Sequence, residues 1–352
     1  MSRHPVDDRI AVGTVGPAGN GISMLARGLA AAAVEQGFGG TVVDEPDAGR
    51  LPALVRRLPV GVRVLHLHVS DWLFADAGAG PDTALAALDR ELAGRRIELA
   101  ITLHDVPQGS DGPRLVRRRA ATYRRWSARA AQVLVSSDHE RALLREVVGG
   151  PAGRAAVVPL PIDPLPGGGG PGSAPTENPV VAVFGFLYPG KGHRELIEAL
   201  TGVRPGLTVL AVGRPSPRHP ELPADLTRLA ADRGIRFQVT GFVPDRELAG
   251  RLRAPVVPVA PQTRISASAS INAWIGAGRR PLVADGRYAR ELAERLPGAL
   301  RIYAEGDLGR QVRLAIREPS RTWVPAGVPI GPTTRTVAAT YLARLRALAA
   351  GG

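Results

Sequence analysis

The chain has 352 residues, enough for two domains of ordinary size, and a formal net charge of +13 that suits a phosphorylated substrate, an anionic membrane surface or nucleic acid. It contains no cysteine, which excludes disulfide bonds, thiolate zinc sites and a cysteine nucleophile. Aromatic residues make up only 4% of it, too few for the stacking platforms of single-stranded nucleic acid binders, so nucleic acid is not expected as a partner. No apolar segment resembles a secretion signal or approaches the ~20 residues of a spanning helix, so we expect a cytoplasmic protein.

The first half of the sequence alternates between short apolar strands and amphipathic helices. Strands are expected at residues 10–15, 41–44, 63–69, 98–104 and 132–136, and helices at residues 23–36, 84–93, 117–131 and 138–148. This alternation predicts a parallel sheet covered by helices on both faces.

A second alternating series follows a segment rich in glycine and proline. Strands are expected at residues 180–186, 207–212, 237–240, 256–259 and 281–284, and helices at residues 193–200, 223–233, 245–253, 270–277, 287–295 and 333–348. The segment 166–178 is predicted to link an N-terminal domain (residues 1–165) to a C-terminal domain (residues 179–330), with the final helix in residues 331–352. The predicted class is α/β, with two Rossmann-like, doubly wound parallel sheets that face a cleft with the carboxyl ends of their strands.

Lysine is almost absent from the chain: of its 45 lysine and arginine residues, only Lys191 is a lysine. It follows a buried-type strand that ends near Gly185 and precedes the helix at residues 193–200. The turn before a helix offers backbone N–H groups and the positive end of the helix dipole to a phosphate. A compact ammonium can fit there where an arginine fork would not. We therefore predict that Lys191 binds phosphate, against the alternative that its position is chance.

A glycine-rich loop containing Gly16, Gly19 and Gly21 joins the first strand to the first helix. Its spacing is that of a phosphate-binding P-loop, but Ile22 stands where the P-loop lysine must be, so an ATPase is not expected. Two interpretations remain. The loop amides approach a ligand, or the loop is simply a tight strand–helix turn.

Three histidines lie in the expected strands. His104 ends a strand at its carboxyl end, beside Asp105, which could orient the imidazole; the alternative is a loop histidine bonded to nearby backbone. His66 and His68 lie two residues apart on another strand and could hold a metal ion. No third ligand is evident, so a place in the core or in the wall of a site is favoured for them.

Small residues lead into the helix at residues 270–277. Ser266 and Ser268 would let an anion approach the N–H groups at its N-terminus, and Arg264 could add a bidentate phosphate contact. Close packing of a short helix against the sheet explains the small residues equally well.

The segment 117–129 is rich in arginine and predicts a basic helix. Such a helix could lie on an acidic membrane surface, with Tyr123 and Trp126 at the interface, so peripheral membrane contact stays open. A solvated helix face is favoured, because few of the positions are apolar.

Together these segments resemble, over nearly the whole chain, the nucleotide-sugar glycosyltransferases of the two-domain GT-B fold, specifically the retaining family 4 type. The resemblance implies that residues 16–21 lie against the donor diphosphate and acceptor, that His104 touches the donor sugar, and that Lys191 binds phosphate. Trp323 and the final helix resemble the tail that packs back toward the N-terminal domain.

Two positions depart from the family pattern. The family places an arginine directly after the glycine that ends the strand, where this chain has Phe186. It also carries a pair of glutamates at the positions of Arg264 and Asn272. Asn272 could still bind the nucleotide ribose by hydrogen bonding. Arg264 reverses the charge beside the sugar and phosphates and could stand in for the arginine missing at position 186.

The resemblance implies transfer of a sugar from a nucleoside-diphosphate sugar to an acceptor, with retention of configuration. No acidic metal-binding cluster is evident in the sequence, so neither a metal ion nor another cofactor is expected. The alternative is a catalytically inactive chain of the same fold that serves as a binding or partner subunit. The sequence leaves the acceptor, the donor's base and sugar, and the oligomeric state open. The expected catalytic residues are His104, Lys191 and Arg264, and the expected donor-binding residues are Gly16, Gly19, Gly21, Gly185, Ser266, Ser268 and Asn272.

Overall fold

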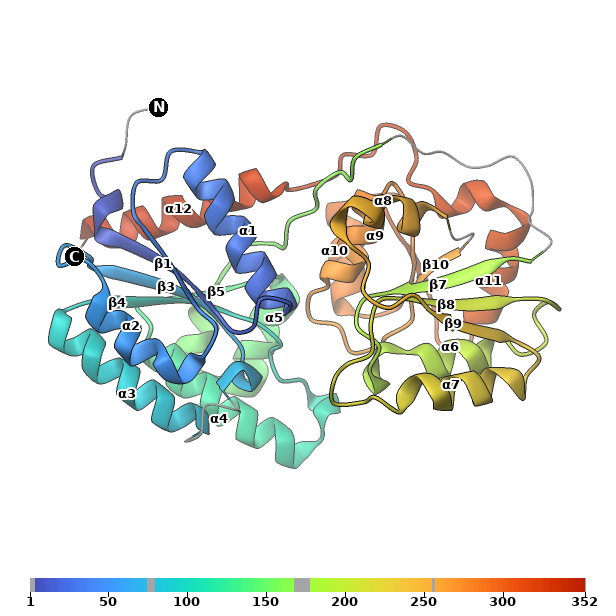
Figure 1. The fold of residues 1–352 in the computed structure, drawn as a ribbon, viewed down its shortest axis with the longest axis horizontal. Coiled ribbons are helices and arrows are strands. Elements are labelled where there is room, and N and C mark those ends of the chain that lie inside the picture. Colours follow the sequence, from blue (N-terminus) through green and yellow to red (C-terminus); the bar gives the residue numbers. More distant parts are fainter. Residues whose placement is uncertain (1–3, 75–79, 168–177, 255–256, 352) are drawn as a thin grey trace. The chain divides into compact units, whose positions relative to one another are not determined.

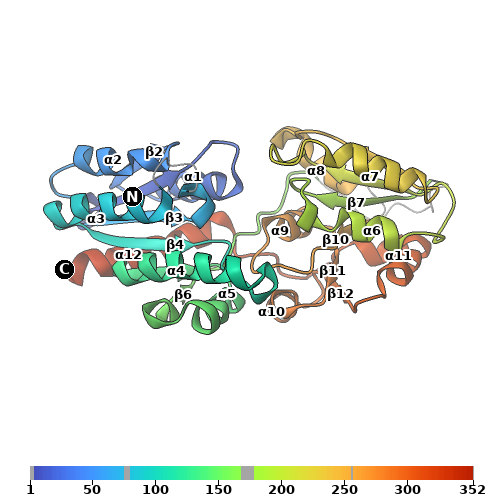
Figure 2. The ribbon, with the colours of Figure 1, turned by 90° about the horizontal axis from the view of Figure 1, so that it is seen from below.

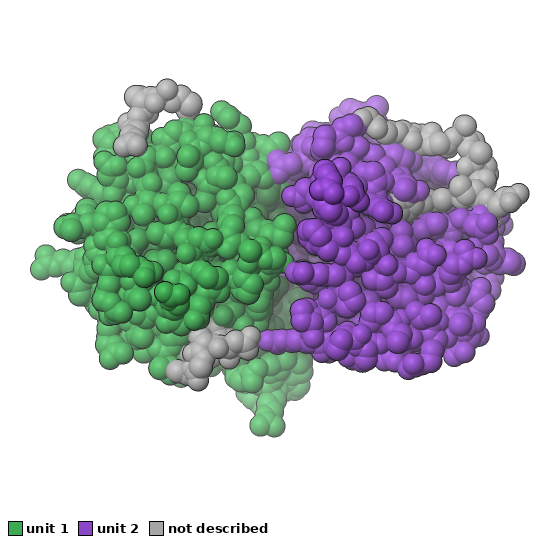
Figure 3. All heavy atoms as spheres, viewed as in Figure 1, with its two compact units in different colours: residues 1–161, 332–352 green, residues 162–331 purple. Residues whose placement is uncertain are grey.

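The computed structural model describes residues 4–74, 80–167, 178–254 and 257–351. The chain forms two compact units, unit 1 with residues 1–161 and 332–352 and unit 2 with residues 162–331 (Figure 3). Each unit contains a six-stranded sheet with helices on both faces, which confirms the predicted class of two doubly wound α/β domains. Residues 166–178, predicted to be a linker, fall within the range of unit 2, and residues 168–177 lie outside the described residues.

The sheet of unit 1 is parallel throughout. Its strands run in the order β2 (Thr41–Glu45), β1 (Ile10–Val15), β3 (Val64–Val69), β4 (Glu98–Leu103), β5 (Gln132–Val135) and β6 (Ala156–Val157). The central strands β3 and β4 are buried almost throughout, as expected of strands covered on both faces.

Two helical layers cover this sheet (Figures 1 and 2). One apolar core joins the sheet to α2 (Leu51–Arg57), α3 (Gly80–Arg95), α4 (Pro113–Arg129) and α5 (Asp138–Leu143), which continues as a π-helical turn at Leu144–Val148. A second core on the other face joins it to α1 (Gly21–Glu35) and to α12 (Thr334–Gly351), the last helix of the chain. Helix α12 therefore belongs to the same unit as β1, although the segment between them forms unit 2.

Unit 2 repeats the plan with its own parallel sheet. Its strands run in the order β12 (Arg301–Tyr303), β11 (Leu282–Ala284), β10 (Val257–Ala260), β7 (Val180–Phe184), β8 (Thr208–Val212) and β9 (Arg236–Val239). One face packs on α6 (His193–Ala199), α7 (Leu222–Ala231) and α11 (Leu308–Arg317), and the other on α8 (Asp245–Arg253), α9 (Ala269–Gly276) and α10 (Arg287–Arg295).

Strand register brings the polar residues of unit 1 together. In the parallel pairing of β3 and β4, His66 lies opposite Ala100 and His68 opposite Thr102. The N–H of His104 continues the ladder by donating to the carbonyl of Val69 at 2.9 Å. The carboxyl ends of these strands therefore present a connected row of polar side chains.

Candidate functional site

Lys191 lies in the turn between β7 and α6, in a single 3-10 turn (Pro189–Lys191). Its side chain is only 6% exposed, and its Nζ donates a hydrogen bond to the Oγ of Ser270 at 2.8 Å. Burial lowers the pKa of Lys191 to about 8, and no carboxylate pairs with it among the residues that the structure describes. A buried ammonium without an acidic partner is stabilised by an anionic ligand.

Two serine hydroxyls connect Lys191 to the beginning of α9. The Oγ of Ser268 lies 3.1 Å from the Oγ of Ser270 and accepts a hydrogen bond from the N–H of Ile271 at 3.3 Å, which makes Ser268 the N-cap. The ammonium and the positive end of the α9 dipole therefore lie at one place, and both favour negative charge.

Gly185 gives the Lys191 side chain its room. Its φ of +117° is in the region that favours glycine, and a Cβ there would lie 3.2 Å from the Nζ of Lys191 and 3.7 Å from the Cβ of Ser270. A side chain at this position would fill the space beside the ammonium.

The other residues of unit 2 that are expected to bind the donor differ from one another in burial. Ser266 and Asn272 are buried, in the loop before α9 and in its first turn. Arg264 is exposed, and within the described part of the chain its side chain makes no hydrogen bond or ion pair. Ser270 was absent from the expected residues. Serine alternates with alanine in this segment, so the sequence does not distinguish Ser270 from its neighbours. Only its contact with Lys191, which is distant in the sequence, identifies it.

Unit 1 carries a buried histidine cluster at the carboxyl ends of β3 and β4. The Nδ1 of His68 lies 3.0 Å from the Nε2 of His104, and the two rings stack with centroids 5.2 Å apart. The Nε2 of His66 lies 2.9 Å from the Oγ1 of Thr102, whose hydroxyl contacts that of Tyr341 on α12 at 3.2 Å. Among the described residues no group of three or more histidine, aspartate or glutamate side chains is arranged to hold a metal ion.

Burial keeps all three of these imidazoles neutral. It lowers the pKa of His66 to about 3, that of His104 to about 4, and that of His68 well below its usual value. A cavity of about 30 Å³, large enough for a water molecule, lies between the sheet, α1 and α12, with His66, His68 and Tyr341 in its wall.

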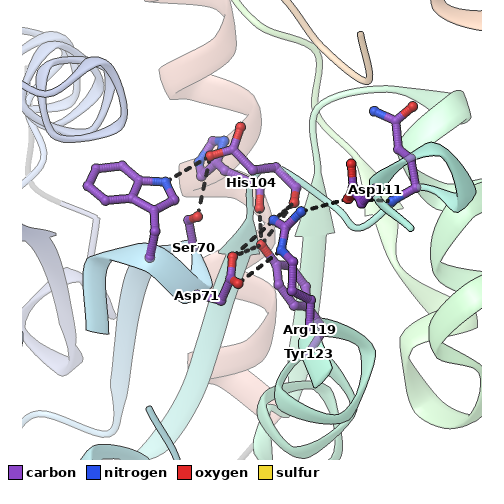
Figure 4. Close-up of polar contacts among 9 residues, drawn as sticks. Ser70, Asp71, His104, Asp111, Arg119 and Tyr123 are labelled. Atoms are coloured by element: carbon purple, nitrogen blue, oxygen red, sulfur yellow. Dashed lines mark hydrogen bonds and ion pairs between the residues drawn. The ribbon is translucent and has the colours of Figure 1, made fainter. Parts of the chain in front are cut away.

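Asp105, which could orient the His104 ring, makes no hydrogen bond with that ring in the described part of the chain and interacts with it through its charge alone. The Asp105 carboxylate instead accepts hydrogen bonds from the Nε1 of Trp72 at 2.9 Å and the Oγ of Ser70 at 3.3 Å (Figure 4). Asp105 has a φ of +52°, which is rare for a residue with a side chain, and these bonds hold it there. The neighbour that contacts the His104 ring is His68.

Arg119 of α4 anchors the loop that follows His104 (Figure 4). Its guanidinium makes two contacts with Asp71, at 2.9 and 3.0 Å, and a third with Asp111 at 2.9 Å, and it also donates to the carbonyl of Asp105. Hydrogen bonding to Asp71 raises the pKa of Arg119 despite the opposing effect of burial. The hydroxyl of Tyr123 donates to the carbonyl of His104, so this helix fixes both ends of the turn.

The glycine loop forms a capped helix N-terminus. The side chain of Asn20 accepts hydrogen bonds from the N–H groups of Ile22 at 2.8 Å and Ser23 at 3.3 Å, so two of the amides already have a partner. Gly16 has a φ of +98°, and a Cβ there would lie 2.6 Å from a methyl group of Leu73. Gly19 is exposed, and a Cβ at Gly21 would meet open space. The tight-turn interpretation therefore accounts for Gly16 and Asn20.

Two further expectations concern aromatic residues. Tyr123 and Trp126 are buried in the core of unit 1, 1% and 3% exposed, so the interpretation that placed them at a membrane interface is wrong. The reason is that α4 turns its aromatic face to the sheet and its arginines, other than Arg119 and Arg129, to solvent. Trp323 belongs to unit 2, where the guanidinium of Arg279 lies 4.4 Å from its ring centroid. No helix in the described ranges is both long and apolar enough to cross a membrane.

By sequence, neither a family model nor a curated protein matches the chain. By structure, it is similar to glycosyltransferases of the GT-B fold. Alr3699/HepE of Anabaena, solved with UDP and glucose, is 17% identical, with a TM-score of 0.69 over 96% of this chain and 99% of that one. Sucrose-phosphate synthase of Thermosynechococcus elongatus is also 17% identical, with a TM-score of 0.70 over 97% and 99%. The pneumococcal O-GlcNAc transferase GtfA, solved with UDP and GlcNAc, is 13% identical, with a TM-score of 0.56 over 84% and 59%. The chain therefore has the two-domain GT-B fold.

Proposed function

We propose that this protein is a glycosyltransferase that moves a sugar from a nucleoside-diphosphate sugar to an acceptor, with retention of configuration. The observation that carries the proposal is Lys191: a buried ammonium, without a carboxylate partner in the described chain, beside the N-terminus of α9. Support comes from solved structures of the same fold, in which Alr3699/HepE is in complex with UDP and glucose or with UDP-glucose.

The chemical difficulty of this reaction is the negative charge that develops on the leaving diphosphate. Lys191 and the N-terminus of α9 would stabilise that charge, because both are held in place before the reaction begins. Gly185 leaves space beside the ammonium for a phosphate oxygen. We assign the ribose to Asn272 and a flanking phosphate contact to Arg264. Both assignments are predictions.

His104 is assigned to the donor sugar. Its Nε2 faces His68, so its Nδ1 is the ring atom that would bond a sugar oxygen. The neutral ring can then position a hydroxyl without adding charge. We assign no step to a metal ion, because Lys191 and the helix N-terminus supply the positive charge that the leaving group requires.

The test is binding and turnover with a panel of nucleoside diphosphates and their sugars. Calorimetry on the wild type and on Lys191→Met should show selective binding that the variant loses. Arg236→Ala, which removes an exposed charge at the amino end of β9, is the matched control and should bind as the wild type does. Release of the diphosphate, with NMR of the product's anomeric proton, tests transfer and retention.

Three results would change the assignment. Binding without turnover for any acceptor or for water would favour the inactive binding subunit. Inversion at the anomeric carbon would contradict retention. Equal affinity of the wild type and Lys191→Met would contradict the phosphate-binding role of Lys191, on which the proposal rests.

A further inference from the structure

Phe186 follows Gly185 at the carboxyl end of β7, and Arg214, two residues beyond the end of the neighbouring strand β8, lies over it. The guanidinium carbon of Arg214 is 5.1 Å from the Phe186 ring centroid. Phe186 is half-buried, whereas Arg214 is exposed and has no acidic partner among the described residues. A flat aromatic ring holds a guanidinium by cation–π attraction and limits its rotation.

The backbone around Arg214 is held against the turn that carries Lys191. The N–H of Leu187 donates to the carbonyl of Arg214 at 3.0 Å, and the N–H of Ser216 donates to the carbonyl of Leu187 at 2.8 Å. These bonds extend the pairing of β7 and β8 past the ends of both strands. The position of Arg214 is therefore set by the sheet rather than by a mobile loop.

Two glycines bring this segment close to the ammonium. A Cβ on Gly213 would lie 2.1 Å from the carbonyl oxygen of Gly185, and a Cβ on Gly185 would lie 3.2 Å from the Nζ of Lys191. Arg214 directly follows Gly213, and Phe186 directly follows Gly185. Arg214 and Lys191 thus extend from segments that meet at the same pair of glycines.

We propose that Arg214, positioned by Phe186, is the second cation of the diphosphate site. This inference rests on the proposed function and identifies the residue that compensates for the missing arginine at position 186, a role that the sequence suggested for Arg264. A guanidinium can bond two phosphate oxygens at once, whereas the ammonium of Lys191 acts as a compact charge. Phe186 is a positioning residue, and Arg214 contacts the ligand.

The test compares a nucleoside diphosphate with the corresponding nucleoside, so that phosphate contacts separate from base contacts. Arg214→Ala should weaken diphosphate binding about tenfold and leave nucleoside binding unchanged. Arg214→Lys should restore part of the loss, because it keeps the charge but not the planar fork. Arg236→Ala, in the same unit, is the control for loss of one positive charge.

Phe186→Leu tests the positioning role. It should weaken diphosphate binding several-fold in the wild-type background and have no further effect in Arg214→Ala, because the ring would act only through the guanidinium.

The outcomes separate this inference from the proposed function. Loss of binding in Lys191→Met together with unchanged binding in Arg214→Ala would overturn the role of Arg214 and leave the donor site in place. An effect of Phe186→Leu that persists undiminished in Arg214→Ala would overturn the positioning role. A wild type that binds no nucleoside diphosphate would overturn both the inference and the function.

Discussion

The Nδ1 of His68 and the Nε2 of His104 lie 3.0 Å apart, inside a unit whose core shields both rings from water. Both imidazoles are neutral, so one ring must donate the hydrogen of this bond and the other must accept it. The tautomer of His68 therefore decides whether the Nδ1 of His104 carries a hydrogen, and with it whether that atom donates to a ligand or accepts from one.

Replacing His68 with leucine should reduce turnover more than donor affinity. The variant leaves the Nε2 of His104 buried without a partner, which costs about 1–3 kcal/mol of stability and releases the ring from its position. A misplaced contact can lower turnover by up to about a hundredfold. Values of kcat and KM measure the change in turnover, and ¹⁵N shifts of the histidines, seven in the wild type and six in this variant, report the release of the His104 ring.

His68→Asn and His219→Asn complete this comparison. The asparagine amide can occupy the place of the Nδ1 and should restore part of the turnover and the His104 tautomer. His219 is half-buried in unit 2 and serves as the control. A kcat for His68→Leu equal to that of the His219 control, with an unchanged His104 signal, would contradict the role of His68.

The histidine cluster should make the protein less stable as the pH falls below about 6.5. The folded-state pKa values of His66, His68 and His104 are lowered by burial, so between pH 6.5 and about 4 the unfolded chain binds more protons than the folded one. The loss of stability approaches about 1.4 kcal/mol per pH unit for each histidine that is protonated in the unfolded chain but not in the folded one. Urea unfolding between pH 5 and 7.5 measures it, and His66→Gln should flatten the curve. A stability that is constant across this range would contradict the assignment of neutral, buried rings.

The alternation of apolar strands and helices was sufficient to predict two parallel sheets, because most of their buried strands are nearly continuous apolar runs, although the buried β3 contains His66 and His68. β6 and β12 are too short to show any periodicity, and α2 has fewer than two turns. The helix α11 is absent from the predicted elements although its buried residues recur at helical spacing, so here the signal was present.

The candidate site was predictable only where a residue type was unusual in itself. Lys191 stands out as the one lysine of the chain, and His104 as a polar residue at the end of an apolar strand. The bond from His68 to His104 depends on the register of two strands, and Tyr341 reaches Thr102 from the last helix of the chain. No local pattern encodes either contact, because each arises from packing of distant segments.

Two arginines of α4 should differ sharply in the stability that the protein loses when each is replaced with alanine. Arg119 is 15% exposed and joins Asp71 and Asp111, so Arg119→Ala leaves two carboxylates in a partly buried place and should cost about 2–3 kcal/mol. Arg125 pairs with Asp82 in full contact with solvent, so Arg125→Ala should change stability little. Thermal or urea unfolding measures both. An equal effect of the two variants would show that the Arg119 contacts do not hold the loop.

Donor binding should take up protons near pH 8. Burial lowers the pKa of Lys191 to about 8, so the free protein is about half protonated there, and a diphosphate beside the ammonium should raise that pKa and complete the protonation. A nucleotide sugar is the suitable ligand, because its diphosphate does not itself titrate in this range. Calorimetry at pH 8 in buffers of different ionisation enthalpy should therefore report an uptake of about half a proton per site.

The same titration at pH 6.5 is the internal control, because Lys191 is then already protonated and the uptake should vanish. Arg214→Ala should bind more weakly at both pH values but keep the uptake at pH 8, since its guanidinium does not titrate in this range. A binding enthalpy at pH 8 that does not depend on the buffer would mean that the ligand lies too far from Lys191 to change its protonation. The diphosphate would then have to be held elsewhere in the unit.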